Sequence, residues 1–180
     1  MDIEITNRDT VAEKATTAIT SEITLRKPKK TDGTLIYELI KNSPPLDVNS
    51  SYCNFLQAIH FKDTCIVAEQ GNKICGFISG YLQPEDSETL FVWQVAIASS
   101  HRGQGLAYKM LDNLLNRKEV DNVRFVETTI TEDNPGSWAL FKKLDSKHTR
   151  EGKVSLFLDE SLHFQGKHDS EYLFRIPIAR

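Results

Sequence analysis

The sequence predicts an α/β domain with a mixed central sheet flanked by helices. Apolar runs typical of buried strands alternate with segments whose apolar residues recur at helical spacing. The predicted order is strand, two helices, hairpin, strand, helix, strand, helix and two closing strands, and neither a linker nor an internal repeat divides it. With 180 residues, 39% of them hydrophobic, the chain can bury one sizeable core.

The first predicted elements follow a polar leader. Residues 1–21 contain no aromatic residue and no sustained apolar period, so we expect them to be disordered and residues 22–180 to form a single domain. A strand over residues 23–25 opens the domain. Asp32 is then expected to cap a helix that ends before Pro44 and Pro45 and whose apolar positions are Leu35, Ile36, Leu39 and Ile40.

The central elements lie on either side of a glycine turn. After a polar loop over 46–52, a second helix presents Phe55, Leu56 and Ile59. Residues 65–69 and 74–82 form a hairpin, and 84–88 form an exposed turn. Residues 90–97 are the central strand. The helix after it buries Leu106, Met110, Leu111, Leu114 and Leu115.

The last elements are predicted from two shorter patterns. Residues 127–131 are rich in β-branched side chains and form a strand. Asn134 is a good N-cap for the next helix, and Pro135 suits its first position. Two closing strands, 154–158 and 172–176, are separated by a polar insert over 159–170.

Composition limits the possible partners and compartments. The formal net charge of −3 argues against a nucleic-acid partner, which requires clustered positive charge. No run of apolar residues is long enough for a membrane span or a secretory signal, so we expect a cytoplasmic protein. Cys53, Cys65 and Cys75 are odd in number, lack metal-type spacing and are interpreted as reduced thiols.

The turn after the central strand is suited to a pyrophosphate. Its Arg-Gly-x-Gly sequence lets the backbone approach an anion, and the first amides of the following helix have no intrahelical acceptor. A dinucleotide-binding fingerprint would need a third glycine, and a triphosphate-binding loop would end in Gly-Lys-Ser/Thr. This turn has neither feature, so both types of phosphate loop are excluded. An ordinary strand–turn–helix corner is the alternative. The candidate cofactor residues here are Val95, Ala96, Ile97, Arg102, Gly103, Gln104, Gly105, Leu106 and Ala107.

These residues, with the strand–turn–helix over 127–141, resemble motif A and the following segment of the GNAT acetyltransferases. The resemblance implies the GNAT fold and acetyl-CoA as cosubstrate. It further implies that Asn134 and Ser137 contact the CoA arm, and that a backbone N–H near residues 95–97 binds the thioester carbonyl. Two positions depart from the pattern: Ser100 replaces the usual Gln or Arg, and Phe141 replaces the tyrosine that serves as general acid.

Four separated segments narrow the resemblance. Residues 44–53, 61–65, 90–95 and 127–131 are similar to the L-2,4-diaminobutyrate acetyltransferases of ectoine biosynthesis. This resemblance implies transfer of an acetyl group to the γ-amine of L-2,4-diaminobutyrate, giving N4-acetyl-L-2,4-diaminobutyrate for the synthesis of an osmoprotectant. It also implies a cytoplasmic homodimer that needs no metal.

The substrate, a dication with one carboxylate, requires acceptors for two ammonium groups. The resemblance selects the following candidates: Asp47, Tyr52, Trp93, Glu127, His168 and Glu171. Each also has a purely structural interpretation: Asp47 as a turn residue, Glu127 as an edge charge and Trp93 as a core side chain. His163, His168 and Glu171 match no common zinc spacing, and a polar loop is the better explanation for them than a metal site.

The chemistry requires an uncharged amine. An ammonium of pKa about 10.4 is neutral at pH 7 only at a cost of roughly 4 to 5 kcal/mol, and a carboxylate that merely binds it deepens this deficit. Our hypothesis is that Asp47 and Glu171 hold the α-ammonium, that Glu127 accepts the γ proton directly or through a water, and that Tyr52 protonates the departing thiolate.

Two alternatives stay open at this stage. Motif A reports only the acyl donor, so the acceptor could be another small diamine or a polyamine. The phenylalanine at position 141 is also compatible with an acyl-CoA sensor that does not catalyse transfer.

Overall fold

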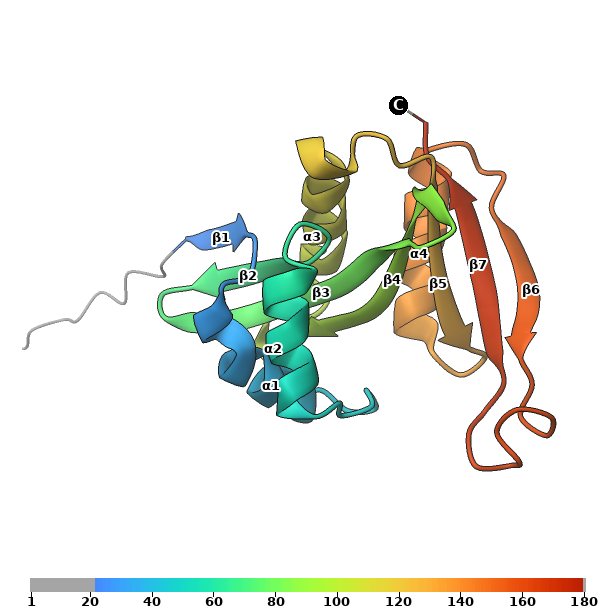
Figure 1. Ribbon diagram of the computed structural model, residues 1–180, viewed down its shortest axis with the longest axis horizontal. Helices are drawn as coiled ribbons and strands as arrows, with labels where there is room; N and C mark the ends of the chain where they lie inside the picture. The colour runs from blue at the N-terminus through green and yellow to red at the C-terminus, as the bar shows by residue number, and fades with distance from the viewer. Residues whose placement is uncertain (1–21, 180) are drawn as a thin grey trace, which may run out of the picture.

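The computed structural model describes residues 22–179, and the leader predicted over residues 1–21 lies outside them. Seven strands form one mixed sheet in the order β1-β2-β3-β4-β5-β7-β6. Within it, β4 and β5 are parallel and the other neighbours are antiparallel. Figure 1 shows the sheet with helices on both faces, as the sequence predicts. The strands are β1 (Ile23–Arg26), β2 (Ile66–Gln70), β3 (Lys73–Gln83), β4 (Asp86–Ile97), β5 (Phe125–Thr131), β6 (Lys153–Leu158) and β7 (Glu171–Pro177).

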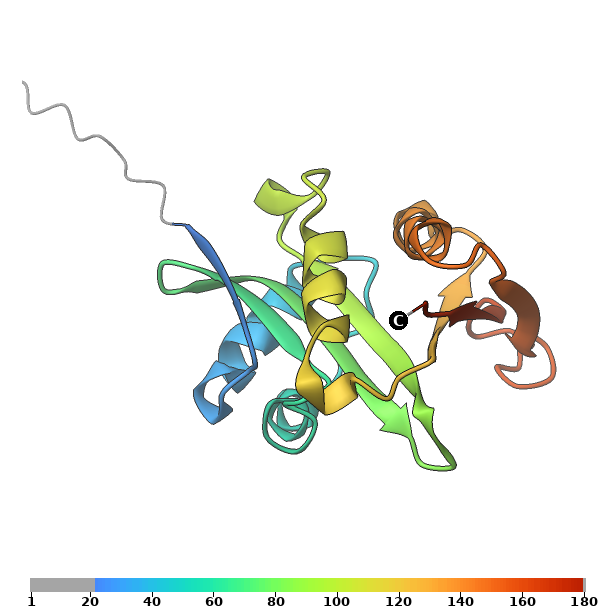
Figure 2. The ribbon, with the colours of Figure 1, turned by 90° about the horizontal axis from the view of Figure 1, so that it is seen from above.

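Two helices lie on each side of the sheet. Helices α1 (Gly33–Lys41) and α2 (Ser51–His60) cover one face, and α3 (Leu106–Leu115) and α4 (Pro135–Lys147) cover the other (Figure 2). Each pair packs on its own cluster of buried side chains. The stripe predicted for the helix after the glycine turn is buried in full. Three short 3-10 helices complete the fold: η1 (Lys30–Asp32), η2 (Ser99–His101) and η3 (Lys118–Val120).

Two predicted apolar faces need correction. Leu35 of α1 is 44% exposed, whereas Ile36, Leu39 and Ile40 are buried. In α2 the fully buried positions include two amides, Asn54 and Gln57, instead of the predicted Phe55, Leu56 and Ile59. Asn54 donates a hydrogen bond to Gln57 over 3.1 Å, and this pairing reduces the cost of burying both amides.

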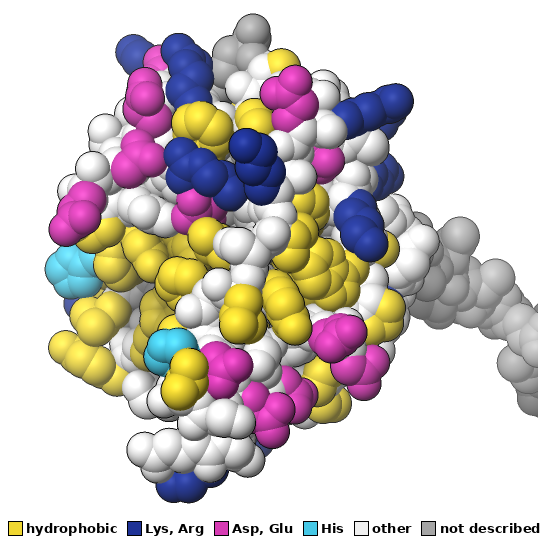
Figure 3. All heavy atoms as spheres, turned by 90° about the vertical axis from the view of Figure 1, so that its right-hand side faces the viewer, with side chains coloured by type: hydrophobic (Ala, Val, Ile, Leu, Met, Phe, Trp, Pro, Cys, Tyr) yellow, Lys and Arg dark blue, Asp and Glu magenta, His cyan; other side chains and the backbone are white. Residues whose placement is uncertain are grey.

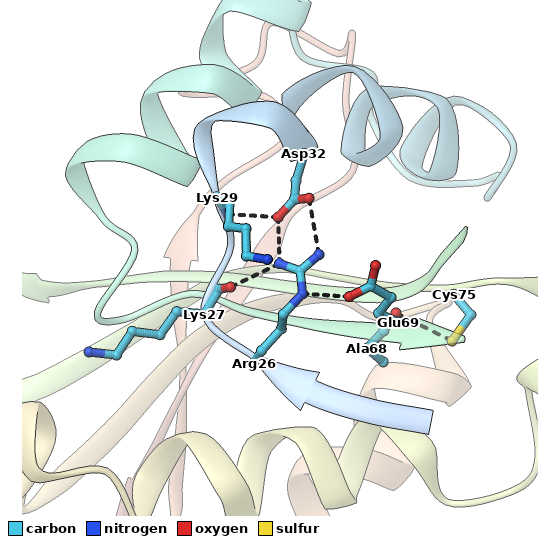
Figure 4. A network of polar contacts seen from close by, with 7 residues as sticks. All are labelled: Arg26, Lys27, Lys29, Asp32, Ala68, Glu69 and Cys75. Carbon is cyan, nitrogen blue, oxygen red and sulfur yellow. Dashed lines mark hydrogen bonds and ion pairs between the residues drawn. The ribbon is translucent and has the colours of Figure 1, made fainter. Parts of the chain in front are cut away.

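Asp32 does not cap α1 with its side chain. Its carboxylate instead accepts hydrogen bonds from Arg26, at 2.7 and 3.1 Å, and from the backbone N–H of Lys29 at 2.6 Å. Arg26 also binds Glu69 of β2 at 2.7 Å (Figure 4). A guanidinium that bridges two carboxylates thus joins β1, β2 and the turn into α1, and this stronger interaction replaces the expected cap.

The exposed turn predicted over residues 84–88 is shorter than expected. Only Pro84 and Glu85 form the turn, and β4 already begins at Asp86. Asp86 accepts hydrogen bonds from the hydroxyl of Thr89 at 2.6 Å and from the N–H of Glu88 at 3.2 Å, so local polar contacts stabilise a strand start that the charged sequence obscures.

Candidate active site

The central feature of the site is a fork between β4 and β5. The two strands pair at only three positions, which end at Phe91 and Glu127. Beyond this point residues 92–95 of β4 and 128–131 of β5 line opposite walls of a cleft of about 730 Å³. The edge of β4 that faced β5 therefore has no strand partner there within the described residues, and its backbone amides are available to a ligand.

Loops and a helix close the sides of this cleft. One wall is the loop before α2, the second is the insert between β6 and β7, and the third is the beginning of α4. Among the residues that line the cleft are Asp47, Trp93, Gln94, Val95, Thr129, Asn134, Ser137, Phe141, His168, Asp169 and Glu171.

The glycine corner between β4 and α3 has the predicted geometry. Gly103 and Gly105 have φ values of 74° and 72°, a backbone conformation that residues other than glycine rarely adopt. A Cβ atom at either position would meet no protein atom within 4 Å, so within the protein itself the backbone conformation is what favours glycine here. Gly105 is the N-cap of α3 and provides no side-chain hydrogen bond, which leaves the first amides of α3 open to an anion.

Side chains around the corner hold its backbone. Arg102 donates from Nε to the carbonyl of Ile97 at 3.0 Å, and Gln104 donates to the carbonyl of Ser100 at 2.9 Å. Arg102 is exposed, Leu106 and Ala96 are buried, and Ile97 and Ala107 are half-buried. Of the predicted cofactor residues in this stretch, Val95 lies in the wall of the cleft.

The start of α4 reaches the cleft through its cap. The side chain of Asn134 accepts a hydrogen bond from the N–H of Ser137 at 3.1 Å, and Pro135 occupies the first turn, as predicted. Phe141 is 1% exposed and forms part of the cleft wall. Its ring has no exchangeable proton, so this position cannot provide a general acid.

Three predicted substrate residues meet where the loop before α2 approaches the insert before β7. The Nε2 atom of His168 lies 3.7 Å from Asp47 Oδ2 and 3.9 Å from Glu171 Oε1. The other ring nitrogen donates to the carbonyl of Asp169 at 2.7 Å. This hydrogen bond is the main reason that the pKa of His168 is raised, and the two carboxylates add to the effect. Burial raises the pKa of Glu171, while contacts with Thr129 and His168 oppose the rise.

The remaining three candidates are separated from this cluster. Trp93 lines the cleft with 47% of its surface exposed. Tyr52 lies in the first turn of α2, is 69% exposed and is not among the cleft-lining residues. Glu127 is buried at the fork, where its carboxylate binds Gln83 and Arg175, and it is not among the cleft-lining residues either.

Gln94 is a site residue that the sequence did not single out. Its Nε2 donates to the backbone carbonyl of Asp47 at 2.9 Å, which attaches the loop before α2 to β4. Its Oε1 is buried and has no partner among the described residues. The register between β3 and β4 shifts at Ser79 and Gly80, directly opposite Gln94, and this bulge determines the direction of the Gln94 side chain. The apolar sequence around Gln94 gives no sign of the bulge, so the sequence did not indicate this residue.

Residues 22–179 contain neither a metal-type cluster nor a helix suited to a membrane. Within this range no three His, Cys, Asp or Glu side chains are grouped closely enough to hold a metal ion. None of the helices in the same range has the length and apolar character that crossing a bilayer demands.

Comparison with known proteins gives a consistent result. The model of the acetyltransferase (GNAT) family matches residues 34–145. The L-2,4-diaminobutyric acid acetyltransferase of Vibrio parahaemolyticus is 58% identical over 153 residues, which cover 85% of this chain and 84% of that protein. The corresponding enzyme of Methylotuvimicrobium alcaliphilum is 43% identical over 86% of this chain and 90% of its own length.

Solved structures agree with the sequence comparisons. The diaminobutyrate acetyltransferase of Paenibacillus lautus, in complex with L-2,4-diaminobutyric acid and coenzyme A, matches with a TM-score of 0.84 and 42% identity over 88% of this chain and 96% of that chain. A ribosomal-protein alanine N-acetyltransferase of Escherichia coli, at 14% identity and a TM-score of 0.66, shares the fold.

Proposed function

The chain belongs to the GNAT acetyltransferase family, and we infer that it transfers the acetyl group of acetyl-CoA to the γ-amine of L-2,4-diaminobutyrate. The observation that carries this conclusion is the combination of two features along β4. The glycine corner that follows β4 and the unpaired edge of the strand suit coenzyme A, and the cleft beside that edge is lined by two carboxylates suited to a diamine. The product is N4-acetyl-L-2,4-diaminobutyrate.

For the cofactor we propose that main-chain groups provide most of the binding. The amides of Gly103 to Ala107 would hold the pyrophosphate, and Asn134 and Ser137 would contact the pantetheine arm. The free edge of β4 near Val95 would donate an N–H to the thioester carbonyl. A backbone donor placed where negative charge develops stabilises the transition state without needing a side chain.

For the diamine we propose that these two carboxylates recognise the amino-acid end. Asp47 and Glu171 would bind the α-ammonium, with His168 held between them, and the ring of Trp93 would contact the aliphatic part or an ammonium. A fixed α-ammonium leaves the γ-amine as the group that can reach the thioester. Selection of the γ-amine is then positional, as the sequence-based hypothesis holds.

The acid and base roles of Tyr52 and Glu127 stay predictions. Neither side chain is among the residues that line the cleft. A proton moving between the cleft and either side chain would therefore have to pass through a group other than the cleft-lining residues. Within the cleft, burial makes Glu171 a stronger base than an exposed carboxylate, and we propose it as the alternative acceptor of the γ proton, in which case Asp47 alone would hold the α-ammonium.

We also propose a homodimer, for which β6 provides the support. This edge strand exposes about half the surface of Val154, Leu156 and Phe157, on both of its faces. Figure 3 shows hydrophobic side chains gathered on this side of the molecule. An exposed apolar edge strand favours association, and a second copy would cover it.

The place of the reaction in the cell is a further proposal. Cys53, Cys65 and Cys75 are free cysteines, which suits the reducing cytoplasm. Consumption of the acetylated product in ectoine biosynthesis, and thus in the supply of an osmoprotectant, rests on the relationship to diaminobutyrate acetyltransferases.

The decisive experiment is an assay of thiol release from acetyl-CoA with a panel of amines. We expect diaminobutyrate to be the preferred acceptor and NMR of the product to place the acetyl group on the γ-nitrogen. A preference for putrescine would indicate a polyamine acetyltransferase. Coenzyme A binding without thiol release for any amine would indicate a sensor.

A further inference from the structure

The buried carboxylate of Glu127 lies where β4 and β5 separate. Glu127 is 5% exposed and forms, with Phe91, the last of the three pairs between these strands. Directly after it, residues 128–131 become one wall of the cleft, and residues 92–95 become the other. A side chain at this position is therefore placed to influence how far apart the two walls stand.

The contacts of Glu127 extend to both halves of the sheet. One carboxylate oxygen accepts a hydrogen bond from Gln83 of β3, which lies on the far side of β4, and the other is bound by Arg175 of β7. Arg175 also lies 3.5 Å from Asp86 at the start of β4. We call these four residues, Gln83, Asp86, Glu127 and Arg175, the fork cluster.

Arg175 is itself held in a defined position. Its guanidinium carbon lies 3.9 Å from the centroid of the Phe125 ring, and Arg175 is the antiparallel partner of Glu127 in the β5–β7 ladder. The cluster thereby connects β3 and β4 on one side of the fork with β5 and β7 on the other. The backbone ladder joins the same two halves through three residue pairs, and a buried apolar cluster spans both halves. The side-chain contacts of the fork cluster add a direct polar link at the point where the ladder ends.

We propose that Glu127 is a positioning residue that fixes the opening of the fork. It thereby sets the distance between β4, to which the Asp47 loop is attached, and β5, whose neighbour β7 carries Glu171. Both oxygens of its carboxylate are engaged in this contact. This assignment rests on the proposed function, and it differs from the role of proton acceptor that the sequence suggests for Glu127. Loss of the cluster should weaken the binding of both substrates, because under the proposed function each of them would contact residues on both sides of the fork.

The test compares Glu127→Gln, Arg175→Met and the double variant with Glu69→Gln as control. Glu69 is also bound by an arginine, Arg26, but in β2 and outside the cleft-lining residues. In Glu127→Gln we expect KM for both substrates to rise about tenfold, with kcat much less affected and the acid limb of its pH profile unmoved. The double variant should lose less than the product of the two single losses, because the two groups act together.

Three results would overturn the proposal. A large fall in kcat at unchanged KM, with a shifted acid limb, would make Glu127 the proton acceptor. A lower Tm with unchanged kinetics would make it structural only, and additive losses would separate it from Arg175. If Arg175→Met does not fold, Gln83→Met, which removes one hydrogen bond from the same carboxylate, should raise both KM values in the same direction.

Coenzyme A affinity separates this proposal from the proposed function. Calorimetry with coenzyme A alone should give a Kd about tenfold higher for Glu127→Gln than for the natural chain, whichever amine is the acceptor. An unchanged Kd contradicts the positioning role even if diaminobutyrate is acetylated. Failure of the natural chain to acetylate diaminobutyrate contradicts the function and leaves the affinity test of the fork valid.

Discussion

His168 Nε2 lies 3.7 Å from Asp47 Oδ2, although Asp47 belongs to the loop before α2 and His168 to the insert before β7. This contact closes one side of the cleft between two segments far apart in the sequence. Glu171, three residues after His168, contributes the second carboxylate. The pair thus joins the two loops that we propose to recognise the amino-acid end of the substrate.

The His168 contact predicts a pH dependence with a definite sign. The hydrogen bond to Asp169 and the nearby carboxylates raise the folded pKa of His168 above its ordinary value of 6.5. Its contribution to stability is therefore fully present below the unfolded pKa and is lost as the pH rises through the folded one. NMR titration should give a pKa above 6.5, and Asp47→Asn should lower it. An unchanged pKa in Asp47→Asn would contradict the contact.

The glycine corner predicts a conformational cost. Gly105→Ala places a Cβ on a residue with φ of 72°, which costs roughly 1–2 kcal/mol although no atom lies nearby. We expect a lower Tm and weaker coenzyme A binding by calorimetry. The matched control is Gly71→Ala in the turn between β2 and β3, where φ is 61°: it should lower the Tm in the same way but leave the coenzyme A affinity unchanged. An equal loss of coenzyme A affinity at both positions would remove the special role of the corner.

The contacts of Arg26 predict that one substitution in edge strand β1 has a large effect on the free energy of unfolding. Arg26→Met leaves the Asp32 carboxylate, whose side chain is 6% exposed, without its cation, and should lower the free energy of unfolding by about 3–5 kcal/mol. Lys27→Met breaks two ion pairs between exposed groups and should cost about 1 kcal/mol or less. Urea denaturation measures both. Similar losses would show that burial does not set the strength of these contacts.

The Arg26–Asp32 contact also predicts how stability changes at acid pH. Burial raises the pKa of Asp32, but the hydrogen bonds from Arg26 and the Lys29 N–H outweigh it, and the net pKa is lowered. The stabilisation is present above the unfolded pKa and is lost as the pH falls through the folded one. Arg26→Met should therefore reduce the loss of stability on acidification.

Edge strand β6 predicts the oligomeric state. Light scattering should show a dimer for the natural chain, and Leu156→Asp, at a position 54% exposed, should give a folded monomer. Leu35→Asp is the matched control, because Leu35 is 44% exposed on α1 and should not affect association. A natural chain that is monomeric, or a dimer that survives Leu156→Asp, contradicts the proposed interface.

Local pattern predicted most of the fold, and long-range contacts explain where it did not. The buried stripe of α3 and the cap at Asn134 depend on neighbouring residues and were predicted correctly. Asp32 was assigned to a local cap, but Arg26 on β1 binds its carboxylate instead. In α2 the buried face follows an amide pair that hydrophobic spacing does not reveal.

The site divides in the same way. The glycine turn is encoded within a few residues, so its geometry could be predicted. The convergence of Asp47, His168 and Glu171 depends on the packing of two loops, and only family resemblance brought these residues together in advance. The same resemblance included Tyr52 and Glu127, which the fold places outside the cleft-lining residues, because resemblance identifies positions without showing which way their side chains lie.

Replacing Gln94 should change the binding of diaminobutyrate without changing the free energy of unfolding. Gln94→Met removes the hydrogen bond to the Asp47 carbonyl, worth about 1 kcal/mol, but it also removes a buried oxygen without a partner, so the two effects should nearly cancel in urea denaturation. Without that attachment the Asp47 loop is less ordered, and KM for diaminobutyrate should rise several-fold while coenzyme A affinity stays constant. Gln57→Met is the matched control. It also removes a buried atom without a partner, but it leaves the buried Nδ2 of Asn54 without its acceptor, whereas Asp47 is exposed to water, so Gln57→Met should lower stability without changing this KM. An unchanged KM in Gln94→Met would mean that the loop is positioned without β4.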